Sequence, residues 1–243
     1  MKKYGLIGKN ISYSFSKKYF ENKFAADGRT DCSYDIYDLA DISGLRNILS
    51  DRDIRGLNVT IPYKRAVMDF LDEIDPQAAQ VGAVNTVKVH PDGHLSGHNS
   101  DVYGFRQALA PFLEPHHERA LILGTGGASD AVAYVLKDLG IEYFFVSRQK
   151  REGNYLTYDE LSATHVRVCP LIVNATPVGT FPHTGFCPAI PYEALDERNL
   201  LFDLIYNPPE TLFLKKGRER GSAISSGLTM LELQAEKSWE LWQ

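Results

Sequence analysis

Residues 119–140 of this chain read RALILGTGGASDAVAYVLKDLG and indicate its fold class. The apolar run 120–123 predicts a buried strand, and the apolar residues within 132–139 fall on one face of a helix that ends at Gly140. The glycine-rich turn between them has the strand–turn–helix context in which such turns hold phosphate groups. The candidate phosphate-binding residues are Gly124, Gly126, Gly127 and Ala128.

Each glycine has a physical role in that hypothesis. Gly124 permits the tight turn, and Gly126 and Gly127 let a pyrophosphate approach the backbone. The free N–H groups and the dipole of the following helix N-terminus favour an anion there. Ser129 takes the place of the third glycine of the usual pattern. The alternative is a turn that needs glycine only for its conformation.

The rest of the chain extends this unit into alternating strands and helices. Apolar or alternating runs predict strands at 3–8, 33–38, 56–61, 83–89, 94–98, 141–146, 171–176 and 199–206. Helical patterns occupy 17–26, 41–50, 64–73 and 227–242. Pro91, Asp92 and Gly93 predict a hairpin turn between two of the strands. The alternation of strands and helices after Asp101 predicts a parallel sheet, which places the chain in the α/β class.

The segment after strand 141–146 predicts which dinucleotide the turn holds. An NAD site usually has Asp or Glu at this point, about 20 residues after the glycine turn, to bind the ribose 2′-hydroxyl. Here the segment contains Ser147, Arg148 and Lys150 and lacks a carboxylate, so it suits a 2′-phosphate. The sequence therefore favours NADP over NAD, the alternative being a solvated basic turn.

Composition narrows the possible partners. The chain has 243 residues, with 26 Lys and Arg against 31 Asp and Glu, so its net charge of -5 argues against a nucleic-acid partner. No apolar run approaches the ~20 residues of a membrane-spanning helix. Cys32, Cys169 and Cys187 are scattered, as expected of reduced thiols in a cytoplasmic protein. A small-molecule enzyme or binder is expected.

Three histidines at intervals of four, His90, His94 and His98, resemble one face of a metal-binding helix. Pro91 and Gly93 would break that helix. A hairpin is the better interpretation, and we predict no metal site.

Polar residues gather at three other points. Asn58, Thr60 and Lys64 follow or end a buried strand, where open α/β sheets bind ligands. Asn85 begins another strand, and Asp101 precedes a helix. Taken singly, Lys64 could be a surface lysine, Asn85 a turn residue and Asp101 an N-cap. The sequence does not show that they meet.

These segments together resemble the shikimate dehydrogenase family. The matching motifs occur in order along essentially the whole chain: NVTIPYK (58–64), GAVNT (82–86), GHNSDVYGF (97–105), ILGTGGAS (122–129), NATPVG (174–179), DLIYNP (203–208) and GLTMLELQA (227–235). The resemblance implies an N-terminal α/β substrate domain over 1–101, a Rossmann-type NADP-binding domain over 102–226, and a C-terminal helix, 227–243, that packs back on the first domain.

The resemblance also implies a reaction, the NADP-dependent interconversion of 3-dehydroshikimate and shikimate in aromatic amino-acid biosynthesis. Hydride reduction of a ketone leaves an alkoxide that needs a proton. By resemblance Lys64 donates that proton, or accepts it in reverse, and Asp101 orients the ammonium group. The implied substrate-binding residues are Ser14, Ser16, Thr60, Lys64, Asn85, Asp101, Tyr206 and Gln234. The implied cofactor-binding residues beyond the glycine and basic turns are Asn174, Thr176, Pro177, Val178, Gly227 and Met230.

Two departures from the family pattern bear on substrate and cofactor. Tyr13 and Lys17 stand where the family commonly has His and Pro around the two serines, and Ser147-Arg148-Gln149 replaces Asn-Arg-Thr. Two alternatives stay open: a quinate or aminoshikimate dehydrogenase using NAD, and a non-catalytic NADP-binding sensor. The expected assembly is a monomer or a homodimer.

Overall fold

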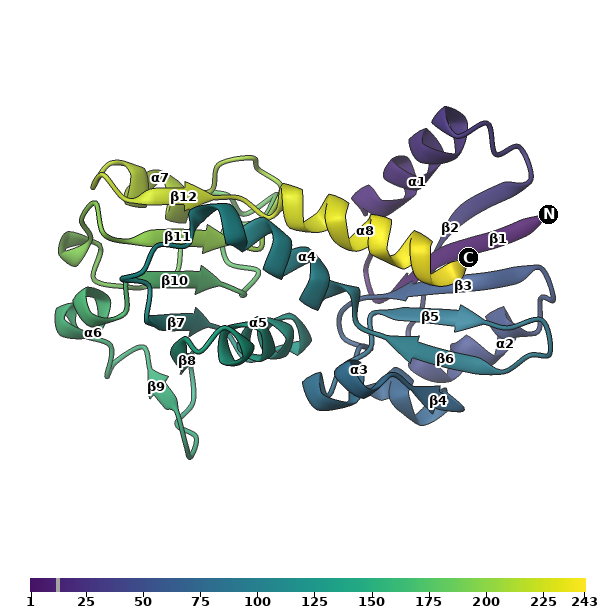
Figure 1. Ribbon diagram of the computed structural model, residues 1–243, viewed down its shortest axis with the longest axis horizontal. Helices are drawn as coiled ribbons and strands as arrows, with labels where there is room; N and C mark the ends of the chain where they lie inside the picture. The colour runs from purple at the N-terminus through teal and green to yellow at the C-terminus, as the bar shows by residue number, and fades with distance from the viewer. Residues whose placement is uncertain (12–13) are drawn as a thin grey trace. The chain divides into compact units, whose positions relative to one another are not determined.

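The computed structural model describes residues 1–11 and 14–243 and shows two compact units (Figure 1). The first unit contains residues 1–100 and 234–243, and the second contains residues 101–233. The chain passes from one unit to the other in helix α4 (Ser100–Leu109) and again in helix α8 (Leu228–Trp242). The domain limits expected at residues 101 and 227 stay predictions.

A six-stranded mixed sheet forms the centre of the first unit, in the order β2-β1-β3-β5-β6-β4. Its strands are β1 (Lys2–Gly8), β2 (Cys32–Asp38), β3 (Ile54–Val59), β4 (Glu73–Ile74), β5 (Thr86–Val89) and β6 (Leu95–His98). β1 runs parallel to β2 and β3, whereas β5 and β6 pair antiparallel across the 91–93 turn. The predicted hairpin is confirmed.

Side-chain alternation along β1 gives this sheet two apolar faces. On one face Tyr4 and Leu6 pack with helix α1 (Phe15–Ala26) and with the end of α8. Trp242 of α8 lies against Gly56, where a Cβ would come within 2.3 Å of the indole. The other face is covered by α2 (Leu45–Leu49) and α3 (Pro76–Val81) and by the 3-10 segments Ile42–Gly44 and Ala66–Phe70.

The helical pattern over 64–73 forms less helix than expected. The segment contains only the 3-10 turn Ala66–Phe70, followed by the two residues of β4. The Asp72 N–H donates to the Leu95 carbonyl at 3.0 Å and β4 pairs with β6, so sheet hydrogen bonding extends the chain there. Tertiary pairing has overridden the local helical spacing.

The second unit contains a six-stranded sheet whose strands are all parallel, in the order β12-β11-β10-β7-β8-β9. The strands are β7 (Arg119–Leu123), β8 (Glu142–Ser147), β9 (Tyr155–Thr157), β10 (Leu171–Asn174), β11 (Leu200–Asp203) and β12 (Ala223–Ser225). Counted along the chain, this is the order 6-5-4-1-2-3 of a Rossmann-type doubly wound sheet. The predicted α/β class is confirmed.

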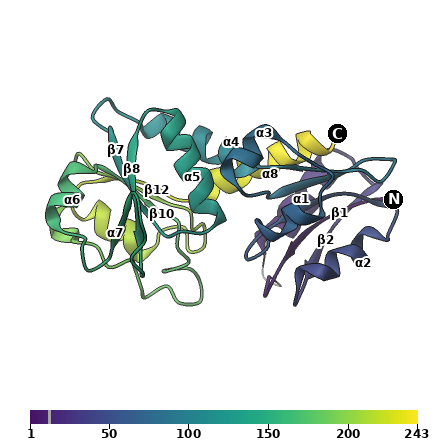
Figure 2. The same ribbon diagram turned by 90° about the horizontal axis from the view of Figure 1, so that it is seen from below.

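Helices cover both faces of the parallel sheet, which Figure 2 shows nearly edge-on. α6 (Ala163–Val168) and α7 (Leu212–Arg218) pack on one face, and α5 (Gly127–Asp138) packs on the other against β7 and β8. Val132, Val135 and Leu136 of α5 are fully buried, as the apolar stripe predicts. Leu139, expected on the same stripe, is 39% exposed because it is the C-cap of the helix.

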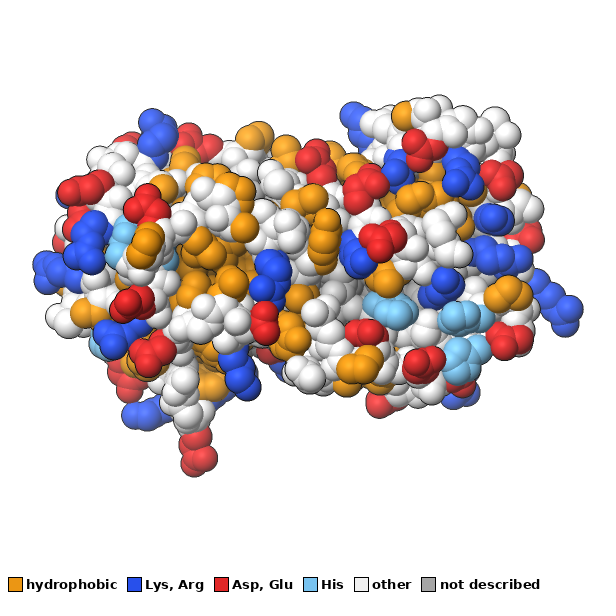
Figure 3. All heavy atoms as spheres, viewed as in Figure 1, with side chains coloured by type: hydrophobic (Ala, Val, Ile, Leu, Met, Phe, Trp, Pro, Cys, Tyr) orange, Lys and Arg blue, Asp and Glu red, His pale blue; other side chains and the backbone are white. Residues whose placement is uncertain are grey.

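No helix within residues 1–11 and 14–243 is long and apolar enough to cross a membrane. On the face of the molecule in Figure 3, Lys and Arg side chains are interspersed with Asp and Glu.

Candidate active site

The carboxyl ends of three neighbouring parallel strands, β8, β7 and β10, carry most of the predicted cofactor residues. β7 and β10 are adjacent, and Leu123, Asn174 and Asp203 lie side by side at the ends of β7, β10 and β11. From β7 the strand order proceeds to β8 and β9 on one side and from β10 to β11 and β12 on the other. Such a switch point is where open α/β sheets bind their ligands.

The glycine turn lies at this switch point, directly after β7. Gly124 has φ +110°, a backbone conformation that favours glycine, and its Cβ position would come within 3.1 Å of the Ala175 carbonyl oxygen. Gly126 is the N-cap of α5 and has open space around its Cβ position. The first-turn N–H groups of a helix have no intrahelical partner. The turn therefore presents donors suited to a pyrophosphate.

Ser129, which replaces the third glycine, has a local structural role. Its side chain is buried, and its hydroxyl accepts a hydrogen bond from the Gly126 N–H at 3.1 Å. This closes the first turn of α5 from within, as a capping residue does. The departure from the glycine pattern therefore keeps the strand–turn–helix geometry.

The predicted 2′-phosphate residues follow β8. Ser147 is buried and its hydroxyl accepts from the Gln149 N–H at 3.2 Å, whereas Arg148 and Lys150 are exposed. The Lys150 ammonium forms an ion pair with Glu160 at 3.2 Å. Glu160, which follows β9, is a carboxylate at this turn that the sequence reasoning missed. Residues 147–151 alone do not predict this ion pair, because Glu160 lies ten positions after Lys150 and is brought to it by the fold.

Asn174 organises the NATPVG segment after β10. Its side-chain oxygen accepts from the Thr176 N–H at 3.1 Å and from the Thr176 hydroxyl at 2.6 Å. The Thr176 hydroxyl oxygen in turn accepts from the Val178 N–H at 3.2 Å. Pro177 and Val178 are exposed at the end of this folded turn. The segment is a preformed loop beside the glycine turn.

Asp203 is fully buried at the end of β11, and the sequence reasoning did not assign it a role. Its carboxylate accepts hydrogen bonds from Asn174, Ile205 and Thr211. Burial raises the pKa of Asp203 to about 6, against the opposing effect of these three donors.

Gly227 lies just before α8, and Met230 lies in the first turn of that helix. Gly227 donates its N–H to the Ile205 carbonyl at 3.0 Å, and a Cβ on Gly227 would lie 2.2 Å from the Leu204 carbonyl oxygen. Only glycine fits this approach of two backbone segments. Met230 is buried and Tyr206 is half-buried.

In the first unit, backbone hydrogen bonds join the segment after β3 to the segment before β5. The Val59 N–H donates to the Asn85 carbonyl at 2.8 Å, and the Val84 N–H donates to the Lys64 carbonyl at 2.8 Å. These hydrogen bonds place the backbone of Lys64 close to the backbone of Asn85. Thr60 and Lys64 are half-buried.

The Asn85 side chain belongs to a buried polar network. Its amide nitrogen donates to the Ser100 hydroxyl at 3.0 Å and to the Gln234 side-chain oxygen at 3.3 Å. Its amide oxygen accepts from the Ser100 N–H at 2.7 Å. The structure therefore brings together two predicted substrate residues, Asn85, which directly precedes β5, and Gln234 of α8.

Other members of this network are Asn58, a polar residue already noted in the sequence, and Ser238, to which the sequence gave no role. Ser238 bonds to the hydroxyls of Thr86 and Ser100 at 2.8 and 3.0 Å. It also accepts from the Asn58 amide at 2.8 Å, and Asn58 accepts from the Tyr34 hydroxyl. Because neighbouring partners satisfy these polar groups, the network holds Asn85 in a defined orientation.

Ser14 and Ser16 begin helix α1. Ser14 is the N-cap, and its hydroxyl oxygen accepts from the Ser16 N–H at 3.3 Å. Lys17, which stands in the family's proline position, pairs with Asp35 at 3.2 Å. Tyr13, the other departure, lies outside the described residues.

Asp101 lies in the first turn of α4, which begins at Ser100, and is 5% exposed. It is therefore the second residue of the helix and not its N-cap. The structure describes Asp101 and Tyr206 in the second unit, and Lys64, Asn85 and Gln234 in the first.

The three histidines lie on and beside the β5–β6 hairpin, as the turn residues predicted. His94 contacts Glu73 and Asp72, and His90 hydrogen-bonds to Ser96. Within residues 1–11 and 14–243, no group of three or more potential ligands is arranged to hold a metal ion.

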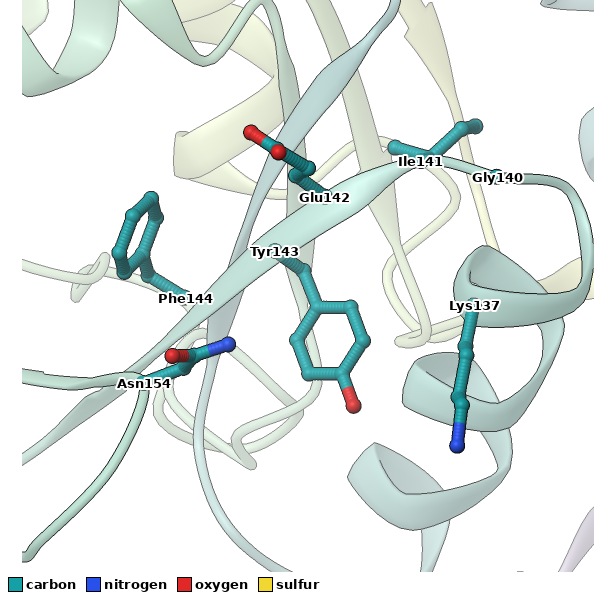
Figure 4. Close-up of a pocket in the computed structure, with 7 residues that line it drawn as sticks. All are labelled: Lys137, Gly140, Ile141, Glu142, Tyr143, Phe144 and Asn154. Atoms are coloured by element: carbon teal, nitrogen blue, oxygen red, sulfur yellow. The ribbon is translucent and has the colours of Figure 1, made fainter.

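A pocket of 570 Å³ lies beside the last turn of α5, at the opposite end of that helix from the glycine turn. Figure 4 shows Lys137 and Tyr143 projecting on one side of β8 and Glu142 and Phe144 on the other. None of the predicted site residues lines it. The chain from 148 to 154 joins β8 to β9 without a helix, which leaves this part of the sheet open.

A comparison with known proteins decides the family. A family model described as the shikimate dehydrogenase substrate binding domain matches residues 6–87. The shikimate dehydrogenase (NADP(+)) of Clostridium beijerinckii is 35% identical over 255 residues, covering 100% of this chain and 92% of the relative. This chain belongs to the shikimate dehydrogenase family. The resemblance seen in the sequence is thereby confirmed.

Solved structures of shikimate dehydrogenase relatives share the whole fold. The Thermus thermophilus shikimate 5-dehydrogenase in complex with NADP(H) and shikimate is 31% identical, with a TM-score of 0.85, covering 100% of this chain and 94% of that chain. The quinate dehydrogenase of Corynebacterium glutamicum in complex with NAD is 30% identical, with a TM-score of 0.84 and coverage of 100% and 93%.

Proposed function

We propose that this member of the shikimate dehydrogenase family interconverts 3-dehydroshikimate and shikimate with NADP. The observation that carries the proposal is the set of residues at the switch point of the parallel sheet. A positive-φ glycine turn, a basic turn after β8 and the folded Asn174 loop surround the place where such a sheet binds a dinucleotide. The same chain carries the substrate-domain motifs.

The chain's residues fit an NADP molecule by their chemistry. The N-terminus of α5 suits the pyrophosphate, and Arg148 and Lys150 suit the 2′-phosphate. Asn174, Thr176, Pro177, Val178, Gly227 and Met230 would contact the rest of the cofactor. NADPH supplies a hydride when it is bound.

Lys64 and Asp101 carry the proton transfer in this proposal. In the direction of reduction, the ketone oxygen of the substrate would become an alkoxide that needs a proton. The Lys64 ammonium gives that oxygen a proton and becomes a neutral amine, which takes a proton from solvent afterwards. By the family resemblance, Asp101 would orient the ammonium group of Lys64 through its carboxylate.

The remaining groups recognise a polyhydroxylated acid. Ser14 and Ser16 would donate hydroxyl hydrogen bonds to the substrate carboxylate. Thr60, Asn85, Gln234 and Tyr206 would bind its ring oxygens. Neutral donors and acceptors that are held in place discriminate strongly against a molecule that leaves them unpaired.

The second candidate is quinate or aminoshikimate oxidation with NAD. Glu160 favours it, because this carboxylate neutralises Lys150 at the turn that would bind the 2′-phosphate. A non-catalytic sensor is the third. The presence of both Lys64 and Asp101 disfavours it, since a protein that only binds has no need of a proton donor.

The test measures nicotinamide absorbance with shikimate and with quinate, each paired with NADP and with NAD. Turnover restricted mainly to shikimate with NADP supports the proposal. Comparable turnover with quinate or a preference for NAD would establish the second candidate. Absence of turnover in all four pairs, with NADPH still bound, would establish the sensor.

We further propose a cytoplasmic setting and a monomeric or homodimeric assembly. The three cysteines are free thiols, which agrees with a reducing compartment.

A further inference from the structure

Asp203 connects three segments around the candidate cofactor site of the second unit. Its Oδ1 accepts from the Asn174 amide at 3.0 Å and from the Ile205 N–H at 3.0 Å. Its Oδ2 accepts from the Thr211 hydroxyl at 2.6 Å. The side chain is fully buried, so water cannot replace a lost partner.

The two carboxylate oxygens serve different parts of the structure. Oδ1 faces Asn174, whose own oxygen folds the Thr176–Val178 turn, and Ile205, whose carbonyl accepts from Gly227. Oδ2 faces Thr211, the N-cap of α7, a helix that packs against β11 and β12. Oδ1 therefore anchors the segments assigned to the cofactor, and Oδ2 anchors the N-terminus of helix α7.

We propose that Asp203 is a positioning residue for cofactor binding, and that its Oδ1 acceptor sets the geometry of the Asn174 loop and of the backbone leading to Gly227. The inference rests on the proposed function, in which these two segments contact NADP. Asp203 itself touches neither substrate nor cofactor. It acts through Asn174 and Ile205.

The Asn174 amide must be oriented for this arrangement to work. Its nitrogen has two acceptors, the Asp203 carboxylate and the Val178 carbonyl at 3.4 Å, so its oxygen points to Thr176. Without an acceptor at position 203, the amide nitrogen keeps only the long 3.4 Å contact to the Val178 carbonyl. The Asn174 side chain is then held less firmly, and so is the acceptor on which the Thr176 turn depends.

Two substitutions separate the acceptor from the charge. Asp203→Ala removes both oxygens. Asp203→Asn keeps one side-chain oxygen. The Asn174 and Ile205 N–H donors favour that oxygen at the position of Oδ1, so the new NH2 group lies next to the Thr211 hydroxyl oxygen. NADPH affinity is measured by fluorescence titration without substrate, and KM for NADP and for shikimate by steady-state kinetics.

We expect Asp203→Ala to raise the NADPH Kd and the KM for NADP by about tenfold or more, because a buried hydrogen-bonding group loses its partner. The KM for shikimate should rise less than the KM for NADP, because the Asn174 loop and the approach to Gly227 are both assigned to the cofactor, whereas only Tyr206, next to Ile205, is assigned to the substrate. Asp203→Asn should keep the NADPH Kd within about threefold of wild type. If Asp203→Ala does not fold, Asp203→Ser, too short to reach both donors, takes its place with the same expectation.

Thr211→Val is the matched structural control. It removes the donor to Oδ2 and the side-chain cap of α7 but leaves Oδ1 and its two donors in place. It should lower thermal stability and leave the NADPH Kd unchanged. A rise of the NADPH Kd in Thr211→Val to the level of Asp203→Ala would mean that Asp203 has only a structural role.

Two further results would overturn the inference: an unchanged NADPH Kd in the folded Ala variant, or equal loss of affinity in the folded Asn and Ala variants. Failure of the proposed function is recognised separately, because then the wild-type chain itself would not bind NADPH or oxidise shikimate.

Discussion

Lys150 and Glu160 form an ion pair, with Nζ of the lysine 3.2 Å from Oε1 of the glutamate. The lysine lies at the basic turn after β8, and the glutamate follows β9. Glu160 also accepts a hydrogen bond from the Thr157 N–H at 2.8 Å, which fixes the position of its carboxylate. The Thr157 N–H and the Lys150 ammonium together hold the pKa of the Glu160 carboxyl below its ordinary value. The turn therefore has one cation already matched by a carboxylate.

We expect Glu160→Gln to increase the preference for NADP over NAD. Removing the negative charge frees Lys150 for a 2′-phosphate, while the amide oxygen still accepts from Thr157. Because both side chains are exposed, the expected gain in the ratio of kcat/KM values is modest, about twofold to fivefold. Asp159→Asn, which removes an adjacent exposed charge, is the control. An unchanged ratio would mean that Lys150 does not contribute to cofactor choice.

Arg148→Ala should weaken NADPH binding by about tenfold or more, since a charge-assisted hydrogen bond to phosphate is lost, and should change NADH binding little. Arg151→Ala is the matched control, because Arg151 stacks over the Tyr155 ring, 5.6 Å from its centre. Fluorescence titration with both nucleotides checks this. Equal loss of NADPH and NADH affinity would refute the 2′-phosphate assignment.

Lys64→Ala should lower turnover by about 10²–10⁴-fold, because the alkoxide loses its proton donor. NADPH should still bind with wild-type affinity. Arg65→Ala, at the next position in the chain, should keep substantial turnover. Near-normal turnover in Lys64→Ala would remove the lysine from the mechanism.

Asp203 should make stability depend on pH in an unusual direction. Its pKa is about 6 in the native protein and near 3.8 when unfolded, so between these values only the native state holds the proton. Its contribution to the free energy of unfolding is full below about pH 4 and is lost as the pH rises through 6, by roughly 2–3 kcal/mol. Asp203→Asn lacks this titration.

Denaturant unfolding of wild type and Asp203→Asn at pH values from 4 to 7 measures that contribution. The stability of wild type relative to the variant should fall as the pH rises. A difference that stays constant over this range would show that the native pKa of Asp203 is not raised.

Gly56→Ala should destabilise the first unit, because the new methyl group would lie within 2.3 Å of the buried Trp242 ring. The expected loss is about 1–3 kcal/mol, the usual range for overpacking a core. Gly185→Ala, where the Cβ would meet nothing within 4 Å, is the control. Thermal denaturation of both variants compares them, and equal melting temperatures would contradict the packing seen at Trp242.

Local patterns in the sequence determined the elements around the cofactor site. The apolar run before Gly124, the glycine turn and the stripe of α5 each depend on residues close in the chain, so periodicity and turn chemistry identify them. The hairpin at 91–93 follows from the same local rules. The ordered motifs identified the family.

Only the tertiary structure decided the partners of the polar groups. Asn85 meets Gln234 from 149 positions away, Asp203 meets Asn174 from 29, and Lys150 meets Glu160 from a different segment. No local periodicity encodes such pairs, because sheet order and helix return bring the residues together. Likewise, pairing of β4 with β6 cut short the helix expected over 64–73. Backbone pairing and burial outweigh the small local preferences that a sequence pattern records.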